Sequence, residues 1–462
     1  MSKPAPLNKS ILREYDVRGT VGLNLESLDA QALGQRFGTV LKSLHPGSTT
    51  LKVVVCRDGR HSSMMLQENL IYGLRQVGIH VTDSGLGPTP MLYFAVKKYG
   101  FSAGIMVTGS HNPPKDNGFK FTLLERPFFG NDIAALYDVS PIFSENFGGY
   151  EALDFQESYI QRLLKGYKKP KTKRLRIAFD PGNGATGAIV SSLCQQLDAD
   201  TFLINEEIDG SFPAHHPDPS VAENMKQLIS LVRANKCDLG IAFDGDGDRI
   251  GVVEEEGRIL WGDQILMILA KDILKHVPNG LVIADVKSSN TVKEWVESLK
   301  GELLLWKTGH SHIKEKMGKT QAVLAGEMSG HIFINHDYYG FDDGLYAAVR
   351  LIQLLQESPL SLKELLNNLP TAFSTPEIRI PCEEENKQKV LDFIKHELPL
   401  EGRLEIDGIR YSNDDGWFLV RASQTGSYLV LRAESTTQEG LENLKKYLKS
   451  LLLKVDVHVQ DL

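Results

Sequence analysis

The chain has 462 residues and a formal net charge of −8, with 42% hydrophobic and 24% charged residues. These proportions are ordinary for a water-soluble globular protein, and no apolar run is long enough to span a bilayer. The negative charge argues against a nucleic-acid or anionic-membrane partner, since both usually demand a basic surface. Because residues 1–6 lack the apolar core of a secretory signal, we expect a cytoplasmic protein.

The chain is too long for one ordinary core, and its length favours three or four domains. Three apolar, β-branched runs each end in a polar turn, at residues 52–56, 175–179 and 281–284. Such runs are typical of buried parallel strands. Each is followed by a segment of helical periodicity, as at residues 64–74. The sequence therefore predicts that a similar α/β unit is used three times.

Further strands are predicted at residues 104–107, 238–243 and 250–253. The loops after the first two carry polar, chemically suggestive residues, and open α/β sheets commonly place ligands at the carboxyl ends of strands. After residue 370 the pattern changes to strands around 417–421 and 428–432, followed by a helix that ends the domain. This region is predicted to be a smaller α+β domain.

Residues 108–114, with the sequence TGSHNPP, follow one of these strands and place Ser110 on a tight loop. A neutral serine is a poor nucleophile, so it needs an adjacent base, for which His111 is the neighbour, or prior conversion to a phosphoserine. Taken alone, the segment is also compatible with a serine in an Asn-Pro turn. A serine hydrolase is disfavoured because the G-x-S-x-G motif is absent.

The segment Asp244-Gly-Asp246-Gly-Asp248-Arg249 places carboxylates at alternate positions of a glycine-rich loop. Such carboxylates suit Mg²⁺, and Arg249 beside them can hold a phosphoryl group. An EF-hand loop is a weak alternative, because its sixth position needs glycine and here is Arg249. A solvated acidic turn is the stronger alternative, although it leaves the two interposed glycines unexplained.

Two later segments contain groups suited to a sugar phosphate. Residues 326–331, GEMSGH, end at His331, and a histidine is suited to proton transfer near neutrality. Residues 421–426, RASQTG, offer a guanidinium and two hydroxyls in a glycine loop, which is suited to clamping a phosphate. Taken alone, the first segment is equally compatible with a loop whose serine caps a helix.

Taken together, these motifs resemble those of the α-D-phosphohexomutase superfamily, and specifically of its bacterial phosphomannomutase/phosphoglucomutase branch. The resemblance spans nearly the whole chain and is carried, in the family's order, by residues 13–19, 108–114, 180–185, 244–249, 326–331 and 421–425. It implies four domains around a central cleft, three related α/β units with mixed sheets and a smaller C-terminal α+β domain. The implied boundaries are 1–153 for the phosphoserine domain, 154–256 for the metal-binding domain, 257–368 for the sugar-binding domain and 369–462 for the phosphate-binding domain.

The resemblance also implies an activity, the reversible interconversion of hexose 1-phosphates and 6-phosphates of mannose and glucose. It would proceed through a phosphoserine and a hexose 1,6-bisphosphate intermediate, with Mg²⁺ and glucose or mannose 1,6-bisphosphate as activator. Hexose phosphates would be the partners of a chain that we expect to be a monomer. A phosphoglucosamine mutase, a metal-dependent sugar-phosphate phosphatase and a non-catalytic binding protein remain as alternatives.

The implied site falls into three groups. The catalytic residues are Ser110, Lys120, His331, Arg249 and His111. The metal ligands are Ser110, Asp244, Asp246 and Asp248. The substrate-binding residues are Tyr15, Arg18, Lys287, His310, Glu327, Ser329, Arg421, Ser423 and Thr425. The last loop departs from the family pattern, because Gln424 stands where Asn is usual and Gly426-Ser427 replaces the residues that lead to a proline.

Overall fold

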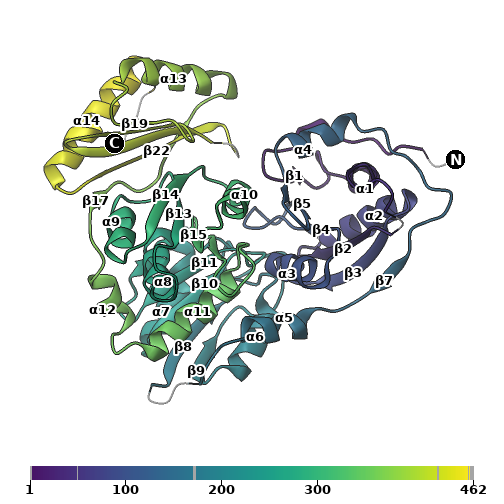
Figure 1. The fold of residues 1–462 in the computed structure, drawn as a ribbon, viewed down its shortest axis with the longest axis horizontal. Coiled ribbons are helices and arrows are strands. Elements are labelled where there is room, and N and C mark those ends of the chain that lie inside the picture. Colours follow the sequence, from purple (N-terminus) through teal and green to yellow (C-terminus); the bar gives the residue numbers. More distant parts are fainter. Residues whose placement is uncertain (1–2, 49, 170–172, 424–425, 456, 458–462) are drawn as a thin grey trace.

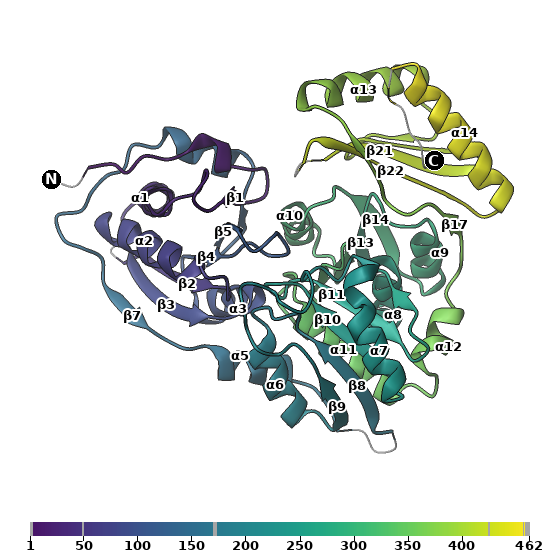
Figure 2. The same cartoon turned by 180° about the vertical axis from the view of Figure 1, so that it is seen from behind.

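The computed structural model describes residues 3–48, 50–169, 173–423, 426–455 and 457. These residues form four sheets, each with its own helices. Figure 1 and the reverse view in Figure 2 show the N-terminal unit on one side, the second and third units in the middle, and the C-terminal unit next to the third. The predicted architecture of three α/β units and a smaller C-terminal domain is confirmed. Every described helix is too short or too polar to cross a bilayer.

The first unit is built on a mixed sheet in which β2 runs parallel to β3 and β4, while β5 is antiparallel to β4. Its strands, in spatial order, are β1 (Val17–Thr20), β5 (Asp116–Leu123), β4 (Ala103–Val107), β2 (Lys52–Arg57), β3 (His80–Leu86) and β7 (Tyr150–Ala152), with β6 (Pro127–Phe128) beside β5. The run from Val53 to Cys56 is fully buried, as expected for a strand covered on both faces. Its helices are η1 (Lys9–Ile11), α1 (Ser27–Leu44), α2 (Ser63–Gln76), α3 (Thr89–Tyr99), α4 (Asn131–Ala135) and η2 (Leu136–Asp138).

The second and third units repeat the strand order of the first. The order β3-β2-β4-β5 recurs as β9-β8-β10-β11 and as β14-β13-β15-β16, and in each unit the last pair is antiparallel. The strands are β8 (Leu175–Asp180), β9 (Ala199–Leu203), β10 (Leu239–Phe243), β11 (Ile250–Glu254), β12 (Ile259–Leu260), β13 (Leu281–Asp285), β14 (Glu302–Trp306), β15 (Leu324–Gly326) and β16 (Ile332–Ile334). Because β12 pairs with β11, the second sheet continues past residue 256, where the sequence placed the end of that domain.

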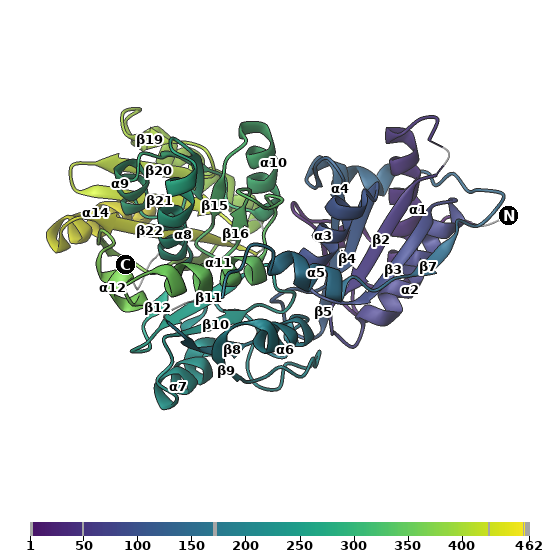
Figure 3. The ribbon, with the colours of Figure 1, turned by 60° about the horizontal axis from the view of Figure 1, so that its bottom comes forward.

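The helices of these two units enclose a hydrophobic core that is continuous with part of the first unit. They are α5 (Gln156–Leu163), α6 (Gly187–Gln196), η3 (Ala222–Met225), α7 (Lys226–Ala234), α8 (Gly262–His276), α9 (Thr291–Ser298), α10 (His310–Thr320), α11 (Gly344–Glu357) and α12 (Leu362–Asn367). Helix α5 packs against α3, α6 and α11, so it joins all three units (Figure 3). The first three units are therefore one packed body.

The C-terminal unit has a core of its own beneath an antiparallel sheet. Its elements are β17 (Phe373–Ser374), β18 (Ile378–Pro381), α13 (Glu384–Glu397), β19 (Arg403–Leu404), β20 (Ile409–Asn413), β21 (Gly416–Ala422), β22 (Tyr428–Ser435) and α14 (Gln438–Leu453). A small apolar cluster of Val286, Trp417 and Leu419 joins it to the third unit. The Arg410 guanidinium stacks on Trp417 at 3.6 Å and donates to the carbonyl oxygens of Val286 and Ser288.

Candidate active site

The three chemically suggestive loops occupy the same position in the three repeated units. Ser110 lies between β4 and β5, the aspartates lie between β10 and β11, and Glu327, Ser329 and His331 lie between β15 and β16. The three loops are in contact. Gly245 of the acidic loop packs so closely on the Ser110 loop that an added Cβ would lie 2.3 Å from the Ser110 carbonyl oxygen. Arg249, at the end of the acidic loop, forms an isolated β-bridge with His331. Repetition of one hairpin therefore brings three different chemistries to one place.

The buried guanidinium of Arg60 binds the backbone of the Ser110 loop. Its Nη1 and Nη2 donate to the carbonyl oxygens of Ser110, Asn112, Pro113 and Asp116 over 2.6–2.9 Å, and its Nε donates to Asp58 at 3.2 Å. All five N–H groups of an arginine are thus in use. The same Asp58 carboxylate accepts from the Thr108 hydroxyl and from the Gly109 amide. Ser110 is held with a positive φ of 49°.

The Ser110 hydroxyl faces both the acidic loop and its neighbouring histidine. Its Oγ donates to Asp244 Oδ2 at 3.0 Å and lies 3.2 Å from His111 Nδ1. Burial and the nearby Arg249 charge lower the pKa of His111 well below its ordinary value. His111 is therefore held as the neutral imidazole, the form that can accept a proton.

The three carboxylates of the acidic loop are fully buried and converge, with one oxygen from each lying within 4.8 Å of the others. Asp246 Oδ1 and Asp248 Oδ1 are buried and have no hydrogen-bond donor. Burial and the charges of Asp248 and Asp246 raise the pKa of Asp244 well above its ordinary value. For Asp246 the positive charge of Lys120 outweighs burial and lowers the pKa. An oxygen-rich cluster of this kind fits a divalent cation.

Lys120 projects from β5 toward this cluster. Its Nζ donates to Asp246 Oδ2 at 2.7 Å and also to Asp248 Oδ2. Arg18 lies nearby, where its Nη1 donates to the Thr108 carbonyl oxygen at 2.6 Å and its Nε donates to Asp16 at 2.7 Å. Two cations of the first unit therefore border the carboxylates of the second.

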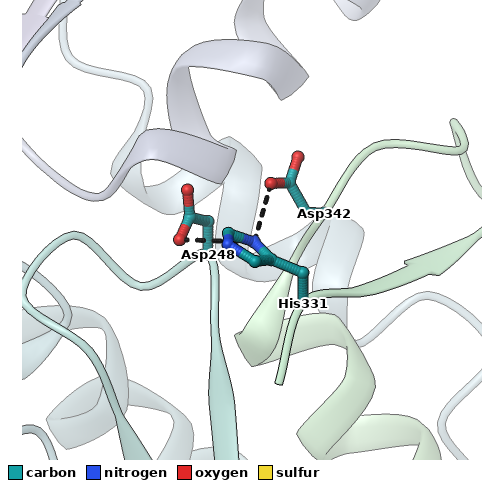
Figure 4. Close-up of side chains that lie close together, drawn as sticks. All are labelled: Asp248, His331 and Asp342. Carbon is teal, nitrogen blue, oxygen red and sulfur yellow. Dashed lines mark ion pairs between the residues drawn. The ribbon is translucent and has the colours of Figure 1, made fainter. Parts of the chain in front are cut away.

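His331 lies between two carboxylates from different units, Asp248 and Asp342 (Figure 4). Its Nδ1 lies 3.0 Å from Asp342 Oδ2 and 3.6 Å from Asp248 Oδ1. On the other side of the ring, Arg249 Nε donates to His331 Nε2 at 2.9 Å. Among the described residues this is the second group that could hold a metal, although Asp342 also accepts a hydrogen bond from Lys314 at 2.9 Å.

The loop after β15 faces the start of α10 and the first unit. Glu327 Oε1 accepts a hydrogen bond from the Gly309 amide, and burial raises the pKa of this carboxyl. The Tyr15 hydroxyl donates to the Thr308 carbonyl oxygen at 3.1 Å. His310 stacks on His331 with ring centroids 5.5 Å apart. Glu327 donates its amide hydrogen to the His331 carbonyl oxygen, and Tyr15 lies beside His310 with ring centroids 6.3 Å apart. Ser329 is half-buried in the same loop.

The predicted phosphate loop of the C-terminal unit is tied to the third unit through Asp407. This carboxylate pairs with Arg421 at 3.0 Å and accepts from the Thr308 amide at 3.1 Å. Ser423 is buried, and its Oγ accepts from the Gly426 amide at 3.2 Å. Lys287 pairs with Glu377 at 3.0 Å, where the chain enters this unit. Thr425 and the departure at Gln424 lie outside the described residues.

Family models match all four units. They are described as phosphoglucomutase/phosphomannomutase alpha/beta/alpha domains I, II and III, at residues 9–133, 157–257 and 261–373, and as the C-terminal domain of the same family at residues 377–450. The chain belongs to the phosphoglucomutase/phosphomannomutase family. The predicted membership of the α-D-phosphohexomutase superfamily, and with it the predicted mutase class, is confirmed.

Full-length relatives agree with this assignment. A phosphomannomutase/phosphoglucomutase of Pseudomonas putida is 40% identical over 99% of this chain and 98% of its own, and a phosphoglucomutase of Neisseria meningitidis is 39% identical over 97% and 98%. A phosphoglucomutase/phosphomannomutase family protein of Burkholderia thailandensis has a crystal structure that matches with a TM-score of 0.89 at 37% identity, over 97% of this chain and 98% of that one.

Four residues that reach the site of this family member were not predicted from sequence: Arg60, Lys314, Asp342 and Asp407. Arg60 follows a predicted strand in a polar turn, so its position at a strand end was available as a signal. Asp342 and Asp407 belong to no motif in the sequence. Asp342 contacts His331 and Lys314 elsewhere in its own unit, and Asp407 contacts Thr308 between the C-terminal and third units.

Proposed function

We propose that this phosphohexomutase interconverts the 1-phosphates and 6-phosphates of both mannose and glucose through a phosphoserine at Ser110. The observation that carries the proposal is the convergence at that hydroxyl. Ser110 Oγ lies 3.0 Å from Asp244 Oδ2 within a buried acidic triad. Arg249 Nε lies 3.9 Å from the same oxygen, and His331 Nδ1 lies 3.6 Å from Asp248 Oδ1. The dual naming of the Pseudomonas relative supports use of both sugars.

Asp244, Asp246, Asp248 and an oxygen on Ser110 would hold Mg²⁺. When bound there, the ion withdraws charge from the phosphoryl group being transferred. The unpartnered, buried oxygens of Asp246 and Asp248 support this assignment. Because the carboxylates are fixed by buried loops, little reorganisation would be needed on binding.

His331 and Lys120 are the proposed acid/base groups for the sugar hydroxyl. Arg249 donates to His331 Nε2, so this nitrogen accepts protons only when the guanidinium turns away. A phosphate is the natural competitor for Arg249, because guanidinium binds phosphate through paired hydrogen bonds. Substrate binding would therefore expose the base at the moment that it is needed.

Recognition would use both ends of the substrate. Arg421, Ser423, Thr425 and Lys287 would hold the distal phosphate, and Glu327 and Ser329 would bind adjacent sugar hydroxyls, since a carboxylate accepts two hydrogen bonds from a diol. Tyr15, Arg18 and His310 would complete the cleft. Mannose and glucose differ only at C2, and one uncontacted hydroxyl allows little discrimination. We further propose a cytoplasmic monomer that is activated by glucose or mannose 1,6-bisphosphate and binds neither nucleic acid nor membrane.

The test is ³¹P NMR of the purified protein with Mg²⁺ and a trace of glucose 1,6-bisphosphate, with mannose, glucose and glucosamine 1-phosphates in separate tubes. We expect the 6-phosphate signal to grow with both mannose and glucose. Ser110→Ala should slow this by at least about a thousandfold, whereas Ser43→Ala, on the exposed side of α1, should match the wild type.

Other results would replace the proposal with a specific alternative. Release of inorganic phosphate alone would indicate a phosphatase. Turnover of glucosamine 1-phosphate alone would indicate a phosphoglucosamine mutase. Full activity of the Ser110→Ala variant would contradict a phosphoserine intermediate.

A further inference from the structure

Lys314 lies next to the site but belongs to none of the motifs. It stands four residues after His310 in α10, so the two side chains share one face of the helix. Its side chain is only 12% exposed. Its Nζ contacts His310 Nδ1 at 3.0 Å, Asp342 Oδ1 at 2.9 Å and the Tyr93 hydroxyl at 3.1 Å.

These three contacts use the full hydrogen-bonding capacity of the ammonium group, which has three donors and no acceptor. The His310 Nδ1 must therefore be the acceptor in its contact with Lys314. In a neutral imidazole, a hydrogen-bond-accepting Nδ1 places the ring hydrogen on Nε2. Burial and the charge of Lys314 lower the pKa of His310 well below its ordinary value, which keeps this ring neutral.

The same lysine fixes the carboxylate that lies against the other histidine of the site. While Oδ1 of Asp342 accepts from Lys314, Oδ2 lies 3.0 Å from His331 Nδ1 and 3.7 Å from His310 Nδ1. Asp342 is fully buried, so a positive partner offsets the cost of keeping its charge away from water. Tyr93 belongs to α3 of the first unit, and its contact therefore connects the pair of histidines to the unit that carries Ser110.

We propose that Lys314 is a positioning residue for this reaction, one that fixes His310 as the Nε2–H tautomer and orients Asp342 against His331. His310 then offers the sugar phosphate a hydrogen-bond donor, where the other tautomer would offer an acceptor. The phosphate oxygens of the substrate only accept, so Nε2–H can bind them and an unprotonated Nε2 cannot. The benefit to binding rests on the proposed function, whereas the tautomer is a property of the protein alone.

The decisive measurement is the ¹⁵N spectrum of the imidazole rings in protein labelled at histidine, with His310 assigned by comparison with His310→Gln. We expect wild-type His310 to carry its hydrogen on Nε2. Lys314→Met should give a mixture of the two tautomers. Lys316→Met is the matched control, because Lys316 lies on the same helix with its Nζ over the Trp306 ring, 4.0 Å from the centroid. Hydrogen on Nδ1 in the wild type would overturn the proposal without any variant.

Kinetics supply the second readout. Lys314→Met should lower kcat/KM for glucose 1-phosphate about tenfold, the size of one lost hydrogen bond to the ligand, with most of the loss in KM. Lys314→Arg, which retains the donors, should recover part of it, and Lys316→Met should match the wild type. An unchanged tautomer together with unchanged kcat/KM in Lys314→Met would overturn the proposal. If the wild type turns over no hexose phosphate, the proposed function fails, and the ring spectra still decide the role of Lys314.

Discussion

The loops that carry Ser110 and His331 occupy the same place in two repeated units, yet they are held in opposite ways. The Ser110 loop is bound from within its own unit, where Arg60 donates to four backbone carbonyl oxygens around it. The His331 loop is bound from the second unit, where the Ile250 amide donates to the Gly330 carbonyl oxygen and Arg249 reaches His331. The backbone around the nucleophile is thus held by an arginine of its own unit, while the Ser110 hydroxyl reaches Asp244 of the second unit. The backbone of the His331 loop is itself bonded to the second unit.

Gly109→Ala should break the first arrangement and have the largest effect. A Cβ at this position would lie 2.3 Å from Nε and Cζ of Arg60. That guanidinium cannot move away without losing bonds, because all of its donors are in use. A nucleophile displaced by about 1 Å typically costs a factor of about 100, so we expect kcat to fall about a hundredfold with little change in KM.

The phosphorylation of Ser110 after incubation with glucose 1,6-bisphosphate, measured by mass spectrometry, separates this effect from a loss of sugar binding. Gly109→Ala should reach a lower stoichiometry than the wild type. If this variant retains wild-type kcat and stoichiometry, the Arg60 contacts do not position the nucleophile.

Gly330→Ala is the matched change in the other loop, since each glycine directly precedes a residue of the site. Gly330 has a φ of +92°, and its Cβ would lie 2.5 Å from the Ile250 carbonyl oxygen. The loop must therefore shift away from the second unit. We expect KM for glucose 1-phosphate to rise about tenfold, because the hydrogen bonds that Glu327 accepts from the sugar and those of Ser329 would weaken.

In contrast to Gly109→Ala, the Gly330→Ala variant should still reach the wild-type endpoint of Ser110 phosphorylation. Steady-state kinetics and the same mass-spectrometric assay test both variants together. A fall in that endpoint as large as in Gly109→Ala would show that the two loops are not held independently.

The sequence supported the prediction of the repeated strands and the site loops because their signals are local. A β-branched run followed by a glycine-rich polar turn defines a strand end within about ten residues, and β2, β8, β10 and β13 all occur where this pattern predicts them. The order of the motifs along the chain then allowed the family to be predicted. The roles given to the individual site residues and the domain boundaries stay predictions, although the structure brings the described members of the set to one region.

What the sequence did not reveal depends on contacts between distant residues. In the sequence Arg60 looks like any charged residue. The fold brings it against the Ser110 loop, 50 positions later in the chain. Asp342 follows a loop of no recognised pattern. It is relevant to the site only because it lies beside both His331 and Lys314. The tertiary fold decides which distant residues such groups contact, and periodicity and motif spacing do not report it.

Glu377→Gln should have the smallest effect. It tests the contact between the C-terminal unit and the third unit, where Glu377 pairs with Lys287. Although burial opposes ionisation, the charge of Lys287 lowers the pKa of Glu377 from 4.5 to about 2. A carboxyl whose pKa is lower in the folded protein contributes stability above the unfolded pKa and loses it as pH falls through the folded pKa. The pair is partly exposed, so we expect a contribution of about 1 kcal/mol.

In calorimetry, wild type should therefore be more stable than Glu377→Gln at pH 6, and the difference should shrink steadily below about pH 4.5. If the difference in stability between the two proteins does not change with pH, this ion pair does not couple the C-terminal unit to the third unit.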